Sequence, residues 1–438
     1  MNTKNYFSGE HLASHFAAIK PQLPGADIGW LEVLREDSMK RFLEIGIPGP
    51  RVEEWKYTNL GLLKNKSFNV SENQIDIDAA LIDTLTIPDL TGSKVVFIDG
   101  YLSIKYTNID KNEGIILSSL NDFVKNNPDR SKALFNNQQS VGGLSNLNLA
   151  LMTGGYVLLI DENIKLAEPI QIIHFATQAE NANTLRTQNF IEIKQGGSAQ
   201  IIENFVSLNQ NFKWRQNNTH ITVAKNASLE IYQFQNESAE MLHMAETYID
   251  VEDEADFKHF SLNIGGMLSR TELKPTLIGK HANIELRGAF LGRDGASHDV
   301  FTHMKHMVPE GTSNQVYRGV LDKGGKSAFQ GRVYVAKDAQ LTNAEQSNKN
   351  LILDRSAEAN SKPELLIYAD DVKCAHGATV GELDQGALFY LKSRGLDHKA
   401  AKALLVEAFV SEVFDDIKIE PVRQKYLTLA RDWLEHGE

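Results

Sequence analysis

The residues with the clearest chemical potential are one cysteine and one histidine near the carboxyl end of the chain. Cys374, the only cysteine among the 438 residues, and His376 lie two residues apart in an alternating apolar and polar run. If this run is a β-strand, both side chains project from one face of it. A thiolate and an imidazole on one face could share a metal ion.

Two ligands make an incomplete metal site, because a bound metal usually requires more protein ligands than one thiolate and one imidazole. A second chain would then have to supply the rest. Both groups bind metal in their deprotonated forms, so binding should weaken as the pH falls. The alternative is that Cys374 is a small buried hydrophobic residue.

A second candidate is the histidine cluster of His298, His303 and His306. Three imidazoles close in sequence could hold a metal, but on a strand His303 and His306 point to opposite faces. This geometry favours satisfied polar or packing roles. Four further histidines are expected to be structural: His220, His243, His259 and His281.

Composition and missing motifs exclude several classes of function. The net charge is -12, without a basic block, so nucleic acid is not an expected partner. The segment 319–327 has the wrong spacing and context for a phosphate-binding loop, and no His-Glu-x-x-His zinc motif occurs. A single cysteine fits a reducing compartment. With neither a signal peptide nor an apolar run of about 18 residues, we expect a cytoplasmic protein without a membrane span.

Helical patterns flank the central part of the chain. Apolar residues recur at helical spacings within 12–45, and 134–151 is also expected to be helical. Asp384 is a candidate N-cap for a helix over 385–394 that Gly395 ends. Asp397 can cap a further helix, and Pro421 opens the last. The expected apolar stripe of the helix after Asp397 is Ala401, Leu404, Leu405, Ala408 and Phe409.

Between these ends the sequence shows a weak internal repeat. Alternating segments begin at Gly197, Ala227, Ala255 and Ala282, in steps of 30, 28 and 27 residues. One polar position recurs in all four: Gln200, Glu230, Lys258 and Glu285. Inward-facing candidates are Leu229, Ile231, Phe257 and Ile284, and weaker echoes begin at Ala328, Ala339 and Ala359. Repeats of this length are typical of solenoids, in which each copy buries its apolar side against the next.

This repeat favours a mainly β fold built on a stacked β-solenoid, and the alternative is a large β-sandwich with fortuitous spacing. Two short strands around Asp99-Gly100 and a buried strand at 156–160 lead into it. We therefore expect a mainly helical region at 1–90, a β-helix core with a mixed entry segment at 91–383, and a helical domain at 384–438.

Several long motifs resemble the SufB/SufD family of iron–sulfur cluster assembly proteins. They are the runs 368–381 and 388–395 around Cys374 and His376, together with 313–321, 338–351 and 50–58. They occur in the family's order and extend over nearly the whole chain. SufB proteins are longer and carry more cysteines, so the single cysteine resembles the SufD form.

The resemblance implies a right-handed parallel β-helix between helical ends, and a non-catalytic scaffold that pairs with SufB. His376 falls at the position implicated in holding the nascent cluster against a SufB cysteine, with Cys374 beside it. The helices after Asp384 would bind the ATPase SufC, so that a charge at Leu405 or Phe409 should abolish docking. The implied cofactors are a transient iron or nascent cluster shared with SufB, and possible reduced flavin on the complex.

Two other classes of function remain open at this point. One is a β-helix enzyme acting on polysaccharide, a chemistry that this fold often hosts, although fold alone never fixes function. The other is a structural protein that forms homodimers through its own solenoid edge.

Overall fold

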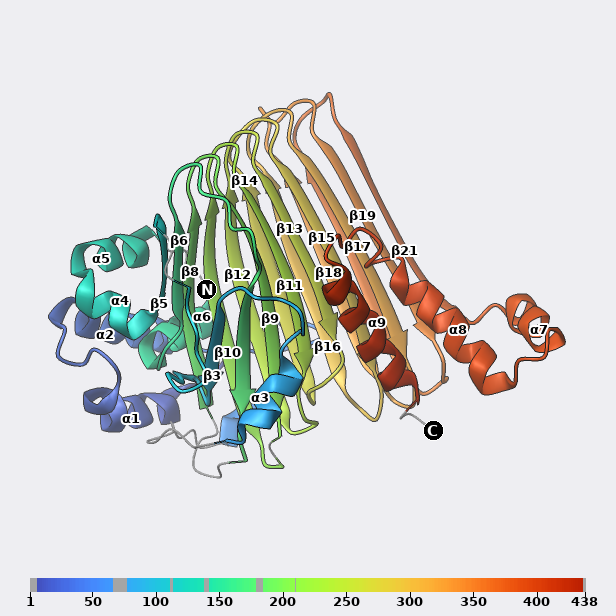
Figure 1. Ribbon diagram of the computed structural model, residues 1–438, viewed down its shortest axis with the longest axis horizontal. Helices are drawn as coiled ribbons and strands as arrows, with labels where there is room; N and C mark the ends of the chain where they lie inside the picture. The colour runs from blue at the N-terminus through green and yellow to red at the C-terminus, as the bar shows by residue number, and fades with distance from the viewer. Residues whose placement is uncertain are drawn as a thin grey trace.

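The computed structural model describes residues 6–65, 77–110, 113–137, 142–178, 184–208 and 210–435. It confirms the expected fold class, because the chain forms a parallel β-solenoid of about seven turns with helices at both ends. Figure 1 shows the strands stacked side by side, the N-terminal helices at one end and the C-terminal helices near the other. No helix in the described ranges is long and apolar enough to cross a membrane.

The solenoid consists of two sheets in which successive strands alternate. Within the described residues the first sheet has nine strands, ordered β20 (Glu358–Ile367), β18 (Lys326–Val335), β16 (Ser297–His306), β14 (Leu268–Leu277), β12 (Met241–Val251), β10 (Lys213–Val223), β8 (Thr184–Ile193), β6 (Tyr156–Ile160) and β5 (Ile115–Ser119). The second has ten, ordered β21 (Lys373–Glu382), β19 (Asn343–Ile352), β17 (Thr312–Leu321), β15 (Asn283–Gly292), β13 (Asp256–Asn263), β11 (Ser228–Asn236), β9 (Ser198–Ser207), β7 (Ile170–Ala176), β3 (Lys94–Ile98) and β4 (Tyr101–Leu102). From β8 onward each turn therefore adds one strand to each sheet.

The repeat seen in the sequence is the register of the second sheet. Glu230 pairs with Gln200 on one side and Lys258 on the other, and Lys258 pairs with Glu285. The predicted inward residues Leu229, Ile231, Phe257 and Ile284 are all buried in the core between the sheets. Both predictions are confirmed. The weaker echoes were wrong in part, because Ala328 and Ala359 lie on β18 and β20 of the other sheet.

One backbone position in each turn explains why the repeats stay in register. The residue two places before each odd-numbered strand from β9 to β19 has a positive φ, as follows: Gly196, Asn226, Glu254, His281, Glu310 and Leu341. Glycine and asparagine adopt this left-handed conformation at little cost, whereas other residues lose about 1–2 kcal/mol. Leu341 (φ 61°) is an unfavourable occupant, and its side chain is 55 % exposed.

Replacing this leucine should stabilise the protein. We expect Leu341→Asn to raise the free energy of unfolding by about 1 kcal/mol, because asparagine tolerates the left-handed region and few contacts of an exposed leucine are lost. The reverse change at the equivalent turn, Asn226→Leu, should cost a similar amount. Urea unfolding of the two variants checks this, and a destabilised Leu341→Asn protein would contradict it.

The N-terminal helices cover the outer face of the first sheet at its beginning. Residues of α1 (Glu10–Ile19), α2 (Gly29–Ile45) and α6 (Gly143–Leu151) pack against Trp214, Leu242 and Leu268 on β10, β12 and β14. The short strands β1 (Tyr6–Phe7) and β2 (Ile47–Pro48) pair beside them, and α4 (Leu120–Asn126) and α5 (Pro128–Asn137) lie at the same end. The expected 134–151 helix is thus two helices, and 138–141 lie outside the described residues.

A shorter helix and three helical turns connect these elements. The segment 61–90 contains the turn Gly61–Asn65 and α3 (Ala79–Leu85), while 66–76 lie outside the described residues. Further 3-10 turns occur at Lys20–Gln22 and Glu53–Trp55. The predicted hairpin is confirmed, because β3 and β4 pair in antiparallel fashion around Asp99 and Gly100.

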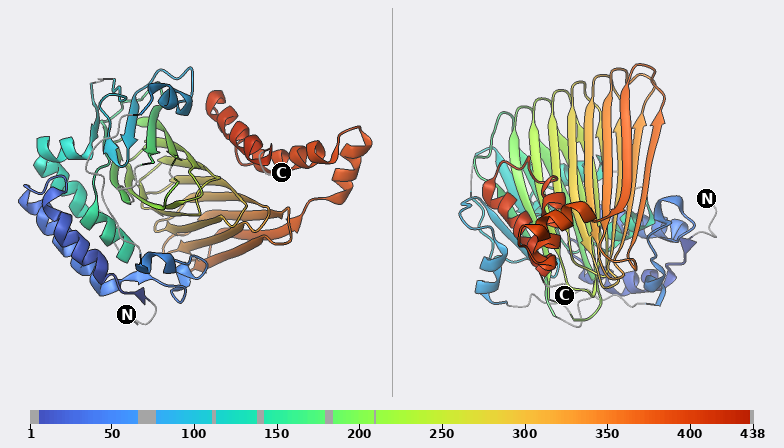
Figure 2. Two further views of the ribbon diagram at one scale, coloured as in Figure 1. Left: turned by 90° about the horizontal axis from the view of Figure 1, so that it is seen from below. Right: turned by 90° about the vertical axis from the view of Figure 1, so that its right-hand side faces the viewer.

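The C-terminal helices divide into a part that packs on the solenoid and a part that leaves it. Helix α9 (Glu420–Glu435) and the end of α8 (His398–Ser411) bury apolar residues against Tyr232, Phe260 and Leu291 of the second sheet. Figures 1 and 2 show α7 (Gln385–Ser393) and the start of α8 projecting beyond the last strands. The buried residues of α8 are Ala401, Val406 and Val410. The predicted stripe was therefore wrong for Leu404 and Ala408, which are both exposed.

Candidate functional site

Cys374 and His376 lie on the last strand of the solenoid, as the sequence predicted. In the ladder Cys374 pairs with Ala344 and His376 with Gln346, and both partners are buried. The two side chains therefore occupy inward-facing positions of β21. Because no strand follows β21 in its sheet among the described residues, the interior of the solenoid is open at this rung.

Cys374 is half-buried and packs against the apolar core between the sheets. Burial raises the pKa of its thiol, and a backbone hydrogen bond involving Ala344 only partly opposes this. The thiol form therefore predominates at neutral pH, although the thiolate is the form that binds metal. A bound cation would have to displace this proton, as metals do when they bind cysteine.

His376 is exposed, and its strand borders a groove of about 430 Å³ on the outer face of the second sheet, although the ring itself occupies an inward-facing position. Arg318 of β17 lies in this groove and donates to Glu412, just after α8, with an Nη2–Oε1 distance of 2.8 Å. Arg287 of β15 forms an ion pair with Asp416. The end of α8 is thus attached by charge pairs to the strands next to the histidine.

The pair remains half a metal site in the isolated chain. Within the part of the chain that the structure describes, no three histidine, cysteine, aspartate or glutamate side chains gather closely enough to hold a metal ion. The arrangement can present one imidazole and one thiol at an open edge. It needs ligands from another molecule to complete a coordination shell.

The edge continues into exposed apolar side chains. Asp384 caps α7 by accepting from the backbone N–H groups of Gly386 and Ala387, which confirms the predicted helix start. On α7 the exposed fractions of Phe389 and Tyr390 are 74 % and 56 %. We call α7 and the start of α8, residues 385–404, the arm. Other exposed apolar residues are Ile367, Tyr368 and Val380 at the edge and Leu396 and Leu404 on the arm.

The histidine cluster has structural roles, as its geometry suggested. His298 and His306 point into the solenoid and hydrogen-bond to Ser269 and Ser313 over 2.8 Å and 2.9 Å. Burial lowers the pKa of each to about 4. His303 lies on the opposite face, so the three rings do not converge.

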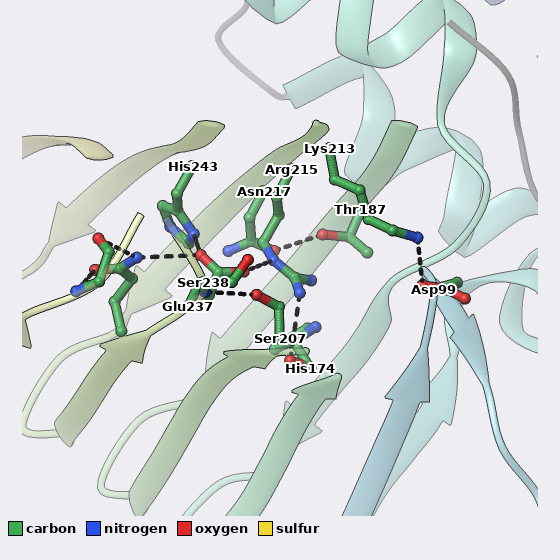
Figure 3. Close-up of polar contacts among 12 residues, drawn as sticks. Asp99, His174, Thr187, Ser207, Lys213, Arg215, Asn217, Glu237, Ser238 and His243 are labelled. Atoms are coloured by element: carbon green, nitrogen blue, oxygen red, sulfur yellow. Dashed lines mark hydrogen bonds and ion pairs between the residues drawn. The ribbon is translucent and has the colours of Figure 1, made fainter. Parts of the chain in front are cut away.

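The sequence did not predict a network of buried ionic groups in the first turns of the solenoid. Figure 3 shows Glu237 between Arg215 and His243, with Arg215 Nε and His243 Nδ1 each 2.7 Å from a carboxylate oxygen. Burial alone would raise the pKa of Glu237, but Arg215 and His243 outweigh it and lower the pKa to about 2. In the same interior His174 lies 2.9 Å from Glu203, and Lys213 lies 3.4 Å from Asp99. These groups neutralise one another inside the fold, so the network is best explained as structural.

A cavity of about 370 Å³ lies between the N-terminal region and the outer face of the first sheet. Two of its three acidic residues, Glu246 and Glu272, both pair with Lys274, and Arg270 also pairs with Glu272. The third, Glu54, pairs with Arg332. Although burial opposes it, Lys274 and Arg270 hold the pKa of Glu272 well below its ordinary value. The carboxylates that line the cavity are therefore engaged by neighbouring cations.

The fold defines a β-solenoid protein whose open edge carries one thiol and one imidazole. Residues 175–409 match the family model described as the SufBD core domain of SUF system FeS cluster assembly, and residues 8–172 match the SufBD N-terminal region. The chain belongs to this family of iron–sulfur cluster assembly proteins.

Curated relatives agree with this assignment along most of their length. The chain is 30 % identical over 384 residues to an iron–sulfur cluster assembly SufBD family protein of Synechocystis, covering 85 % of this chain and 84 % of the relative. It is 28 % identical over 400 residues to the iron–sulfur cluster assembly protein SufD of Escherichia coli, covering 90 % of each chain. The SufD of Bacillus subtilis is 24 % identical, with 91 % of this chain and 93 % of the relative covered.

Proposed function

We propose that the chain is a scaffold subunit that pairs with a SufB-type solenoid and binds a SufC-type ATPase during cluster assembly. The observation that carries the proposal is the unprotected end of the solenoid, where the ten-residue strands β20 and β21 have no outer neighbour among the described residues. Proteins normally shorten, charge or cover such edges to prevent unwanted pairing. An edge that is instead long and flanked by exposed Tyr368 and Val380 favours a partner strand.

At such an interface iron or the nascent cluster would be cargo shared by two chains. His376 would contribute an imidazole and Cys374 a thiolate, and the SufB-type chain would contribute the remaining ligands. The exposed arm would receive the ATPase, and the attachment of the end of α8 to β15 and β17 would connect that partner to the edge. In this proposal the chain supplies position and ligands, while ATP hydrolysis takes place in the partner.

The test is to purify the tagged chain from its own host and to identify what accompanies it by native mass spectrometry. We expect an ATPase and a second solenoid chain. Recovery of the chain alone or as a homodimer would contradict the proposal.

The ligand role has its own test in the same purified complex. We expect His376→Ala to leave assembly intact and to lower bound iron by about tenfold or more, since even the loss of a residue that supports a ligand costs 10- to 100-fold in affinity. Metal analysis after anaerobic purification measures this, with His281→Ala as a control at an exposed histidine. Unchanged iron in His376→Ala would reject the ligand role.

A further inference from the structure

A row of inward-facing side chains leads from the solenoid interior to His376. The parallel register places Leu286, Gln315, Gln346 and His376 at equivalent positions of β15, β17, β19 and β21. Adjacent strands in a sheet lie about 4.8 Å apart. The row therefore changes from an apolar residue to two amides and then to the imidazole at the open edge.

The two amides lack hydrogen-bond partners among the residues that the structure describes. Gln315 and Gln346 are 0 % and 3 % exposed, and neither the oxygen nor the nitrogen of either amide is paired within these ranges. Leaving such a buried group unsatisfied costs about 1–3 kcal/mol. Unpaired buried groups are uncommon in native proteins, so these amides require an explanation.

The amide of Gln346 reaches across the solenoid interior to the facing sheet, one strand inside the open edge. It packs against Gly331 of the facing sheet, where an added Cβ would lie 2.0 Å from Nε2. In the last turn the position of Gly331 is taken by Pro363, which has no N–H group. The inward neighbours of His376 on its own strand are Cys374 and Ala378. Among these neighbouring side chains, the amide of Gln346 is the polar group able to pair strongly with the imidazole.

We propose that Gln346 is a positioning residue for His376: its Oε1 accepts the imidazole N–H, which leaves the other ring nitrogen free to bind metal at the open edge. The two side chains are not hydrogen-bonded in this conformation. Rotations about their χ bonds can join them, because side chains on adjacent strands stand about 4.8 Å apart. The purpose of this contact rests on the proposed function, in which His376 is a metal ligand.

The physical reason is that the two nitrogens of a neutral imidazole have different roles. The nitrogen that donates a hydrogen bond to its surroundings keeps the proton. The other nitrogen is then free to bind a metal. Metal-binding histidines almost always donate their second N–H to a carbonyl, carboxylate or water, and this fixes the ring orientation. The Gln346 amide oxygen would provide that acceptor before any metal arrives.

Nitrogen NMR of the full chain tests the contact directly. With ¹⁵N-histidine labelling, the His376 signals are assigned by their loss in His376→Gln and recorded at about pH 8, where an ordinary imidazole is neutral. We expect one tautomer to dominate in the wild type and a mixture in Gln346→Met, which keeps the shape but removes the amide. Gln315→Met, one strand further inside, is the matched control and should leave the His376 signals unchanged. The same tautomer populations in wild type and Gln346→Met would overturn the proposal.

Iron content of the purified complex provides the second measurement. Gln346→Met should lower bound iron by about 10- to 100-fold, the usual effect of removing the hydrogen-bond partner of a ligand, whereas Gln315→Met should not. Equal iron in Gln346→Met and Gln315→Met would also overturn the positioning role. If the proposed function is wrong instead, the complex with His376→Ala should keep its iron. The NMR result on the contact between Gln346 and His376 would then still hold, because it does not depend on iron binding.

Discussion

Lowering the pH from 7 to 5 should remove about 5 kcal/mol from the free energy of unfolding through three buried histidines. His259, His298 and His306 are at most 3 % exposed, and burial lowers the pKa of each from 6.5 to about 4. Each is neutral in the folded chain but takes up a proton in the unfolded chain below about pH 6.5. These three histidines therefore give their full stabilisation above pH 6.5, and this stabilisation is lost as the pH falls toward 4. At pH 5 the loss is about 2 kcal/mol per histidine.

This loss is large compared with the 5–15 kcal/mol by which proteins are usually stable. Urea unfolding at a series of pH values measures it. We expect the slope between pH 6.5 and 5 to be smaller in His306→Gln by about one proton, or about 1.4 kcal/mol per pH unit. Ile104→Gln, which changes no titratable group at a residue that is 84 % exposed, is the control and should keep the slope of the wild type. A slope in His306→Gln equal to that of the wild type would contradict the prediction.

If the arm binds an ATPase as proposed, a charge on the arm should strongly weaken that binding. We expect Phe389→Asp to weaken the affinity by about 100-fold or more, equivalent to about 2.7 kcal/mol, because large aromatic side chains contribute most of the energy at interfaces. Phe389 is 74 % exposed, so the substitution should leave the fold unchanged. Isothermal calorimetry with the purified ATPase gives the affinity, and thermal unfolding verifies the fold.

The structure also gives a reason to prefer Phe389 to Phe409 in that experiment. The sequence suggested Leu405 and Phe409, but Phe409 packs against the core beneath the C-terminal helices and lies 5.9 Å from Arg318. A charge there would act on folding rather than on docking alone. Ile104→Asp is a suitable control, because Ile104 is 84 % exposed on the N-terminal side of the solenoid. If Phe389→Asp binds the ATPase as tightly as the control, the arm is not the docking surface.

The sequence by itself determined the elements and their faces. The alternation around Cys374 and His376 defined a strand and placed both side chains on one side of it, since successive residues of a strand always alternate. The repeated polar position from Gln200 to Glu285 likewise predicted the register of four strands. Caps such as Asp384 act on the backbone only two or three residues away, so a local pattern is enough to locate them.

Only the tertiary structure decided which side chains meet between turns. Glu237 joins Arg215 from 22 residues earlier and His243 from six residues later, and Gln346 comes beneath His376 from 30 residues away. Turn lengths differ, so spacing in the sequence does not give these neighbours. The sequence did not predict which side chains of a helix are exposed to solvent either. Leu404 and Phe409 belong to one predicted stripe, yet Leu404 faces solvent and Phe409 packs on the solenoid. Periodicity shows that a helix has an apolar face, whereas the path of the chain decides what covers it.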